Sequence, residues 1–444
     1  YIKEAVASSK NDNPSLLYEL EIIQRVMLMN YGGLIPDHER YEWVNAARRL
    51  QQLCSAVMAK GLEDTMFYCF NRLISLNEVG GNPEVFGLNL KDFHEFNIKR
   101  AKNWPNTMNA SATHDTKRGE DSRCRLDCLS ELPKEWKSIL NEMSRLNRKI
   151  KTNGNSSQAP DKNDEYLIYQ SIIGGFPFIE GELPGFVERL ESFIVKAVRE
   201  AKVHTGWLRP DAFYEDACKN FIRALFSQEI SPHFYKIFVP FIKRLSFYGI
   251  LNSLTQVLLK ISCPGVCDIY QGTELWDLSL CDPDNRRPVD FIKRDLLLRG
   301  MISEGRKDVL SLVRGLLSTK EDGRVKQFLI YSFLNERKRN AELFSKGSYA
   351  PLDAQGAYKR NLIAFLRKYE GRRSVTIGTR LMTEVVKEGQ WPLGREVWLD
   401  TYIEIPEGEV QWRDAATGRI LTDDGRLFVG DIFEYLPSAM LISG

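Results

Sequence analysis

The sequence lacks an excess of charge of either sign: 61 Lys and Arg residues face 59 Asp and Glu residues, which leaves a formal net charge of +2. So balanced a chain gives no electrostatic reason to expect nucleic acid or an anionic membrane as a partner. It also lacks any apolar run near the roughly 20 residues that span a bilayer. We therefore expect a soluble globular protein whose substrate is not a polyanion.

Clustered cysteines are missing as well. The eight cysteines are dispersed along 444 residues and no secretory signal opens the sequence, which favours a reducing cytoplasm and predicts no disulfides. Cys124 and Cys128 are four residues apart, as are Cys263 and Cys267, whereas zinc sites more often use shorter pairs with further Cys or His nearby. The sequence therefore predicts no metal site.

An initiator Met is absent too, and a helical pattern is already under way in the first residues, so we expect a fragment of a longer protein. Apolar residues recur at helical spacing from Leu16 to Leu53, with a Gly- and Pro-containing break over residues 31–41 between two helices. There is no internal repeat and no coiled-coil heptad. The chain is thus expected to open with a helical region.

Three short apolar stretches are typical of buried parallel strands that run out into polar loops: residues 54–61, 106–115 and 261–272. The interval between the second and the third is far too long for one crossover helix between neighbouring strands of a barrel. An insertion must fill it, and the apolar spacing predicts helices over 132–150, 164–176, 183–202 and 210–226, with a polar linker at 151–163.

The pattern changes towards the C-terminus. Further helices are expected from Pro288 to about Lys368. Beyond them, β-branched and aromatic residues alternate with turn residues at spacings typical of an antiparallel sandwich. We therefore predict an all-β domain over residues 370–444.

Polar side chains follow each predicted strand. His114 and Asp115 come after the second strand, and two interpretations stay open for them. Asp115, Thr116 or Glu120 can cap the following helix with an ion pair nearby. Alternatively, the pair forms a catalytic loop at the carboxyl end of a barrel strand. The mixture of donors, acceptors and aromatic rings at the three strand ends suits a neutral carbohydrate.

Three motifs carry a resemblance to a known family: VMAKGLEDTMFYCFNRLISLNEVGGNP, ATHDTKRGEDSR and DIYQGTELWDLSLCDPDNRRPVDF. In this order they closely resemble the maltooligosyltrehalose synthase family of the α-amylase superfamily, and a weaker match covers most of the chain. The resemblance implies an intramolecular transglucosylation without a cofactor. The terminal α-1,4 bond of a maltooligosaccharide is broken and the glucosyl unit is rejoined through an α-1,1 bond.

The resemblance also implies the fold and its boundaries. The class is α/β: the C-terminal part of a (β/α)₈ TIM barrel with a large helical insertion, followed by a C-terminal all-β sandwich domain. The implied domains are a helical lead-in (1–54), a barrel part with strands six and seven (55–118), the helical insertion (119–250), strand eight with following helices (251–369) and the β domain (370–444).

Functional residues follow from the matched motifs. Asp115 corresponds to the third carboxylate of the superfamily, which stabilises the transition state, and His114 binds the same sugar. Lys60, Lys117 and Arg118 are expected at the reducing-side subsites. Glu63, Asp64 and Tyr68 are expected to bind substrate. The remaining residues are expected to bind sugar or to brace loops: Tyr270, Gln271, Glu274, Asp284, Asn285, Arg286 and Arg287.

Retaining glycosidase chemistry also needs a nucleophile and a general acid, about 5–5.5 Å apart. No stretch matches the Arg-x-Asp motif of the nucleophile or the strand-ending Glu of the acid. We therefore expect a missing N-terminal half of the barrel as a partner, because an incomplete barrel leaves open edges. Two rival functions stay open: an α-glucan hydrolase of the same superfamily, and a non-catalytic glucan-binding protein.

Overall fold

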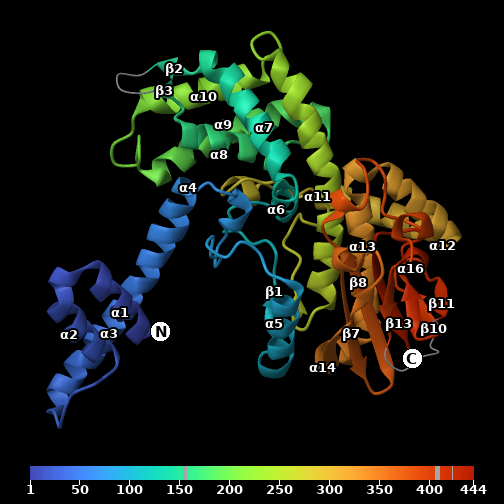
Figure 1. Cartoon of the computed structure of the whole chain (residues 1–444), viewed down its shortest axis with the longest axis horizontal. Helices are drawn as coiled ribbons and strands as arrows, with labels where there is room; N and C mark the ends of the chain where they lie inside the picture. Colours follow the sequence, from blue (N-terminus) through green and yellow to red (C-terminus); the bar gives the residue numbers. More distant parts are fainter. Residues whose placement is uncertain (154–157, 406–410, 423) are drawn as a thin grey trace. The chain divides into compact units, whose positions relative to one another are not determined.

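The structure, a computed structural model, describes residues 1–444 apart from 154–157, 406–410 and 423 (Figure 1). The described residues form two compact units, Tyr1–Cys69 and Phe70–Gly444. Helices and strands both contribute, which confirms a fold that mixes the two. None of the described helices combines the length and the apolarity that crossing a bilayer requires.

The first unit is helical, as predicted. Its elements are α1 (Ile2–Asp12), η1 (Pro14–Leu16), α2 (Leu17–Met27), α3 (Asp37–Val57), η2 (Met58–Met66) and α4 (Phe67–Cys69). The break between α2 and α3 contains Gly32, whose φ of 69° lies in the left-handed region that glycine adopts most readily. The predicted pair of helices separated by a Gly- and Pro-containing turn is therefore confirmed.

The predicted strand over residues 54–61 is wrong. Helix α3 continues to Val57, and η2, a π-helix, carries the chain to Met66. The residues before this stretch, NAARRLQQL, are mostly strong helix formers, so the helix propagates into it. A short apolar run does not by itself distinguish a strand from a helix segment, and here the helical context decides.

In the second unit the other two predicted strands are present, although short. Strands β1 (Met108–Asn109) and β4 (Val266–Cys267) pair in parallel. Gly265 permits this approach, since its φ is 125° and a Cβ there would lie 2.5 Å from the Thr107 carbonyl oxygen. Before β1 lie η3 (Ile74–Leu76) and α5 (Leu90–Asn103). The two predicted loops therefore leave neighbouring strands in the same direction.

A helical region separates β1 from β4. It contains α6 (Glu120–Asp127), η4 (Cys128–Ser130), α7 (Pro133–Asn147), η5 (Arg148–Ile150), α8 (Lys162–Gly175), η6 (Glu180–Glu182), α9 (Leu183–Ala201), α10 (Ala212–Phe226), η7 (Phe234–Phe238) and α11 (Val239–Ser262). Helices α7 to α10 gather in one group (Figure 1). The four predicted helices are confirmed. The predicted linker contains strands β2 (Thr152–Asn153) and β3 (Gln158–Ala159), and its residues 154–157 lie outside the described residues.

The remaining helices of the second unit are η8 (Asp284–Arg286), α12 (Phe291–Ser318), η9 (Lys320–Asp322), α13 (Arg324–Arg339), α14 (Ala341–Lys346), η10 (Lys359–Asn361), η11 (Met382–Glu384), α15 (Arg395–Trp398) and α16 (Val429–Ile432). The strands are β5 (Ser348–Pro351), β6 (Ala354–Gln355), β7 (Leu362–Tyr369), β8 (Arg372–Thr379), β9 (Tyr402–Glu404), β10 (Gln411–Asp414), β11 (Ile420–Thr422), β12 (Arg426–Phe428) and β13 (Ser438–Ser443).

These strands form two antiparallel sheets. One has six strands in the order β11-β10-β13-β8-β7-β5, and the other has three in the order β12-β9-β6. Helix α11 packs against β8 and β13 and contributes to the large apolar core together with α12 and α13. This long buried helix therefore links the end of the helical region to the sheet and leads directly into β4.

The predicted helices end too late, because strands begin at Ser348 rather than after Lys368. The stretch LIAFLRKY, expected to be helical, is β7 and pairs with β8 from Leu362 to Tyr369. The two residues between these strands, Glu370 and Gly371, have φ values of 45° and 83°. A two-residue turn with both φ values positive suits the twist of a hairpin, which explains why this apolar run pairs as a strand.

Candidate active site

The loop after β1, residues 110–119, is here termed the HD loop. His114 and Asp115 are exposed in it, and neither side chain makes a hydrogen bond or ion pair with the described part of the chain. The loop is shaped by its own threonines. The Asp115 N–H donates to Thr113 Oγ1 at 3.2 Å, and the Thr116 hydroxyl donates to the Thr113 carbonyl at 2.9 Å.

The capping interpretation fails for this loop. Helix α6 begins at Glu120, its cap residue is Gly119, and no side chain caps it. Asp115 and Thr116 therefore do not act as helix caps. The imidazole and the carboxylate are presented to solvent from a structured turn.

A second loop, residues 281–287, holds the HD loop in place. The side-chain amide of Asn285 donates to the carbonyls of Thr113, His114 and Thr116 at 3.3, 3.1 and 3.3 Å. Arg286 Nε also donates to the His114 carbonyl, at 3.2 Å. Four hydrogen bonds thus fix the backbone of the HD loop, while the side chains of His114 and Asp115 stay unpaired.

The other predicted residues of the third motif mostly brace this second loop. Asp284 accepts hydrogen bonds from the Leu280 N–H at 2.8 Å and from Arg189 Nη1 at 2.7 Å, and Arg287 Nε lies 2.9 Å from its carboxylate. The Tyr270 hydroxyl donates to the Asn285 carbonyl at 3.4 Å. Between sugar binding and loop bracing, the geometry of these residues favours bracing.

Glu274 braces a neighbouring segment, because it accepts from Arg294 Nε at 3.1 Å. Gln271 lines a cavity of about 600 Å³. Tyr270, Trp276, Asn285 and Arg287 also contribute to its wall. The cavity is large enough for a small ligand and combines aromatic with polar groups, as sugar sites do.

Lys117 and Arg118 follow Asp115 but are buried, with 4 % and 3 % of their surface exposed. Their backbone N–H groups donate to the two oxygens of Glu78, at 2.7 and 3.3 Å, and Arg118 Nη1 donates to the Ile74 carbonyl at 3.0 Å. Arg123 Nη1 bonds the same Glu78 carboxylate at 2.7 Å. Glu78 therefore fixes the C-terminal side of the HD loop.

Lys60, Glu63, Asp64 and Tyr68 lie in the other unit, on η2 and α4, where Lys60 pairs with Asp64. A common site with the HD loop stays a prediction for these four residues.

Beneath the HD loop lies a buried ionic network at the start of α6. Glu120 Oε1 is 2.6 Å from Lys326 and Glu120 Oε2 is 2.9 Å from Lys260, while Asp121 Oδ2 is 2.7 Å from Lys326. Ser111 of the HD loop donates to Glu120 and accepts from Lys260 at 2.7 Å. Burial alone raises the pKa of Glu120, but Lys326 and then Lys260 outweigh it and lower that pKa to about 2. Glu120 therefore stays charged at neutral pH, whereas burial raises the pKa of Asp121. The network ties α6, α11 and α13 to the loop.

The chain is similar to proteins of known name along its whole length. It is 33% identical over 439 residues to a protein of Mycobacterium tuberculosis named as a maltooligosyl trehalose synthase. The crystal structure of maltooligosyltrehalose synthase from Arthrobacter ramosus matches 100% of this chain with a TM-score of 0.80 at 32% identity.

The whole chain resembles maltooligosyltrehalose synthases. The similarity covers 99% of the chain but 49% of the Mycobacterium protein and 51% of the Arthrobacter protein, so the chain spans about half the length of these relatives. A hypothetical maltooligosyl trehalose synthase of Sulfolobus tokodaii matches as well, at 29% identity and a TM-score of 0.67, over 58% of its own chain. No protein-family model matches. The resemblance predicted from the three motifs, to a C-terminal portion of such an enzyme, is confirmed.

Sequence reasoning missed the supporting role of several residues that hold the HD loop. Glu78 stands in LISLNEVGG of the first motif, and Lys260 and Lys326 stand in helices with no catalytic pattern. Glu120 and Asp121 directly follow TKRG in the second motif, and two adjacent acids that start a helix resemble an ordinary dipole-compensating first turn. Their complete burial, which marks them as structural, is visible only in the fold.

Proposed function

We propose that this chain forms the part of a maltooligosyltrehalose synthase that carries the third carboxylate. The observation that supports this most directly is the HD loop. It presents an unpaired imidazole and carboxylate from a backbone held by Asn285 and Glu78, beside two parallel strands. The reaction is the conversion of the terminal α-1,4 bond of a maltooligosaccharide into an α-1,1 bond.

In this proposal Asp115 stabilises the positive charge that develops on the glucosyl ring in the transition state. A carboxylate can do so only if it keeps its charge unpaired and its position fixed, and both conditions agree with the loop contacts. His114 donates a hydrogen bond to a hydroxyl of the same sugar. Tyr270, Gln271 and the 281–287 loop, with the cavity beside them, accommodate further sugar units.

The nucleophile and the general acid are proposed to come from a further part of the protein, which completes the barrel begun by β1 and β4. Lys60 is proposed to act at the reducing-side subsites and Glu63, Asp64 and Tyr68 to bind substrate. Lys117 and Arg118, also expected at these subsites, are buried and are proposed to support the HD loop. We further propose that the two antiparallel sheets form a sandwich domain and that the protein acts in the cytoplasm.

The decisive substitution is Asp115→Asn in the longer protein that contains these residues. The amide nearly preserves the shape of the side chain but removes its charge, so we expect a loss of three to four powers of ten in kcat, or about 4–5 kcal/mol of transition-state stabilisation. Asp295→Asn, which changes an exposed helix residue, is the matched control.

The assay quantifies trehalose-terminated product and free glucose from maltopentaose by chromatography. An Asp115→Asn variant within tenfold of the wild-type rate would remove Asp115 from the reaction. Free glucose as the main product of the wild-type protein would instead identify an α-glucan hydrolase.

A further inference from the structure

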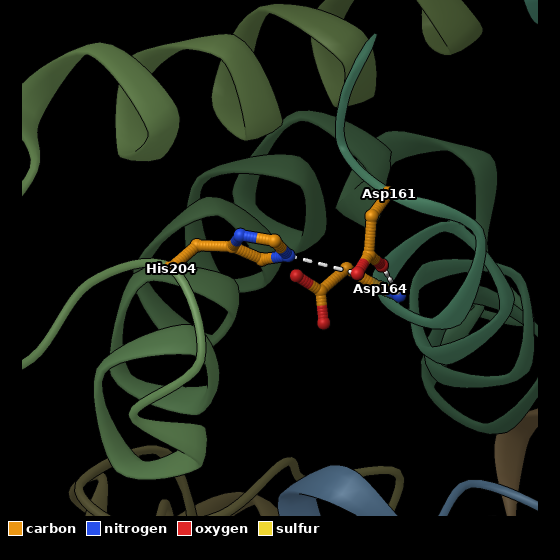
Figure 2. A group of neighbouring side chains, drawn as sticks. All are labelled: Asp161, Asp164 and His204. Carbon is orange, nitrogen blue, oxygen red and sulfur yellow. Dashed lines mark hydrogen bonds and ion pairs between the residues drawn. The ribbon is translucent and has the colours of Figure 1, made fainter. Parts of the chain in front are cut away.

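Three side chains with metal-binding atoms meet in the helical region, away from the HD loop. Asp161 caps α8, Asp164 lies in the first turn of that helix, and His204 follows α9. One ligand atom from each residue lies within 4.8 Å of the other two. Figure 2 shows the Asp164 carboxylate beside the dashed contact from His204 Nε2 to Asp161 Oδ2, which is 2.8 Å long.

The Asp164 carboxylate is not fully accounted for by its neighbours. Only 5% of the residue is exposed, and the Tyr214 hydroxyl donates to its Oδ2 at 2.5 Å. Its other oxygen has no hydrogen-bond or ion-pair partner among the residues that the structure describes. Most of this carboxylate is buried, which makes its charge costly unless a cation or a proton balances it, and the unpartnered oxygen is open to such a ligand.

The basic side chains that act on Asp164 pair with other carboxylates. The charge of Lys151 acts on Asp164, but its ammonium is 2.6 Å from the Glu165 carboxylate, and both groups are buried. His204 is bonded to Asp161 rather than to Asp164. Two carboxylates therefore share one imidazole.

The group is also held in a fixed geometry. Asp161 Oδ1 accepts the Asp164 N–H at 2.8 Å, which leaves Oδ2 turned towards His204. The His204 ring stacks on Tyr214 with 4.3 Å between ring centroids. The next residue, Thr205, is anchored by its hydroxyl to Glu215 at 2.7 Å. The ligand atoms are thus oriented by contacts outside the group.

We propose that Asp161, Asp164 and His204 bind one divalent transition-metal ion, with Zn²⁺ as the best match. An imidazole nitrogen with two carboxylate oxygens suits zinc, whereas Mg²⁺ and Ca²⁺ prefer oxygen ligands alone. His204 and Asp161 are 27% and 31% exposed, so the ion has access and a water can complete four-coordination. The ion would join the start of α8 to the segment between α9 and α10 and would stabilise this region.

The test measures Zn²⁺ binding to the metal-free 444-residue chain by isothermal titration calorimetry. The variants are His204→Gln and Asp164→Asn, and His38→Gln, a histidine in the other unit, is the matched control. We expect one Zn²⁺ per chain and affinity at least about tenfold weaker in the two site variants, because each loses a ligand. Circular dichroism checks that each variant is folded.

Two further measurements test the proposal: the unfolding temperature and the spectrum of the Co²⁺-bound chain. Zn²⁺ should raise the unfolding temperature of the wild-type chain and of His38→Gln but not of the site variants, because a ligand that binds only the folded state stabilises it. Co²⁺ in place of Zn²⁺ should give a spectrum without thiolate charge-transfer bands, which separates this site from the free cysteines. Absence of binding, equal binding by all variants, or a thiolate spectrum would each overturn the proposal.

Discussion

At the scale of single residues, the segment that begins with His114 contains two kinds of side chain: some are exposed to solvent, and others support the HD loop. His114 and Asp115 are exposed and unpaired, whereas Thr116, Lys117 and Arg118 are buried in the loop contacts. In the third motif, Asn285 is likewise a supporting residue, because its side-chain amide donates hydrogen bonds to three carbonyls of the HD loop. The sequence motif identifies the segment, but the contacts in the fold are needed to distinguish the exposed side chains from those that support the loop.

Asn285→Ala should therefore reduce activity through the position of Asp115. In the longer protein we expect kcat to fall by about 10²-fold, the cost that a small misplacement of a reacting group can reach, with less change in KM. Asn335→Ala is the control, because Asn335 also donates to a carbonyl, that of Tyr331 at 2.7 Å, but within α13. Initial rates over a range of maltopentaose concentrations give both constants. A wild-type kcat in Asn285→Ala would show that the loop keeps its position without this amide.

At the scale of elements, α6 begins with two buried carboxylates that bond lysines from α11 and α13. Such a network is weak evidence for added stability, but removing one charge from it is costly because the partner charges stay buried. The stability of the start of α6 therefore depends on the charge of Glu120. The position of the HD loop depends on it too, because Ser111 of that loop bonds Glu120.

Glu120→Gln should lower the free energy of unfolding at neutral pH by about 3–5 kcal/mol. The wild-type protein should also lose this contribution in acid. The pKa of Glu120 is lowered from 4.5 to about 2 in the fold, so its stabilisation is present above pH 4.5 and is lost as the pH falls towards 2. Urea unfolding at several pH values, with Glu342→Gln in an exposed pair as control, tests both points. A Glu120→Gln variant as stable as wild type at pH 7 would contradict the prediction.

The elements also show how far sequence reasoning reaches here. Long amphipathic segments such as α7 and α9 were predictable, because their apolar spacing spans several turns. Residues 54–61 and β7 were not, because a mostly apolar run of eight residues fits either structure. The neighbouring residues decide: helix formers precede the first run, and a hairpin turn follows the second. Asp161 and His204 were not singled out because 43 positions separate them, and no local spacing reports a pair that the fold brings together.

At the scale of the whole molecule, the described strands β1 and β4 form a two-stranded parallel sheet. Parallel sheets are normally buried between helices and continue into further strands, so this pair is consistent with one segment of a larger sheet. The chain spans about half the length of its relatives. Its catalytic competence therefore depends on which carboxylates the 444 residues contain.

The isolated chain should not convert maltopentaose, because none of its motifs matches the nucleophile or the general acid of the superfamily, and Asp115 alone cannot form or break the glycosidic bond. Incubation of the purified chain followed by chromatography should show neither trehalose-terminated product nor glucose. The longer protein is the positive control and should turn over at about 1–10³ per second, as enzymes commonly do. Turnover by the isolated chain at such a rate would mean that two of its own acidic residues serve as nucleophile and acid. The buried acids beneath the HD loop are poor candidates for these roles, since Lys260 and Lys326 already hold the Glu120 carboxylate away from any substrate.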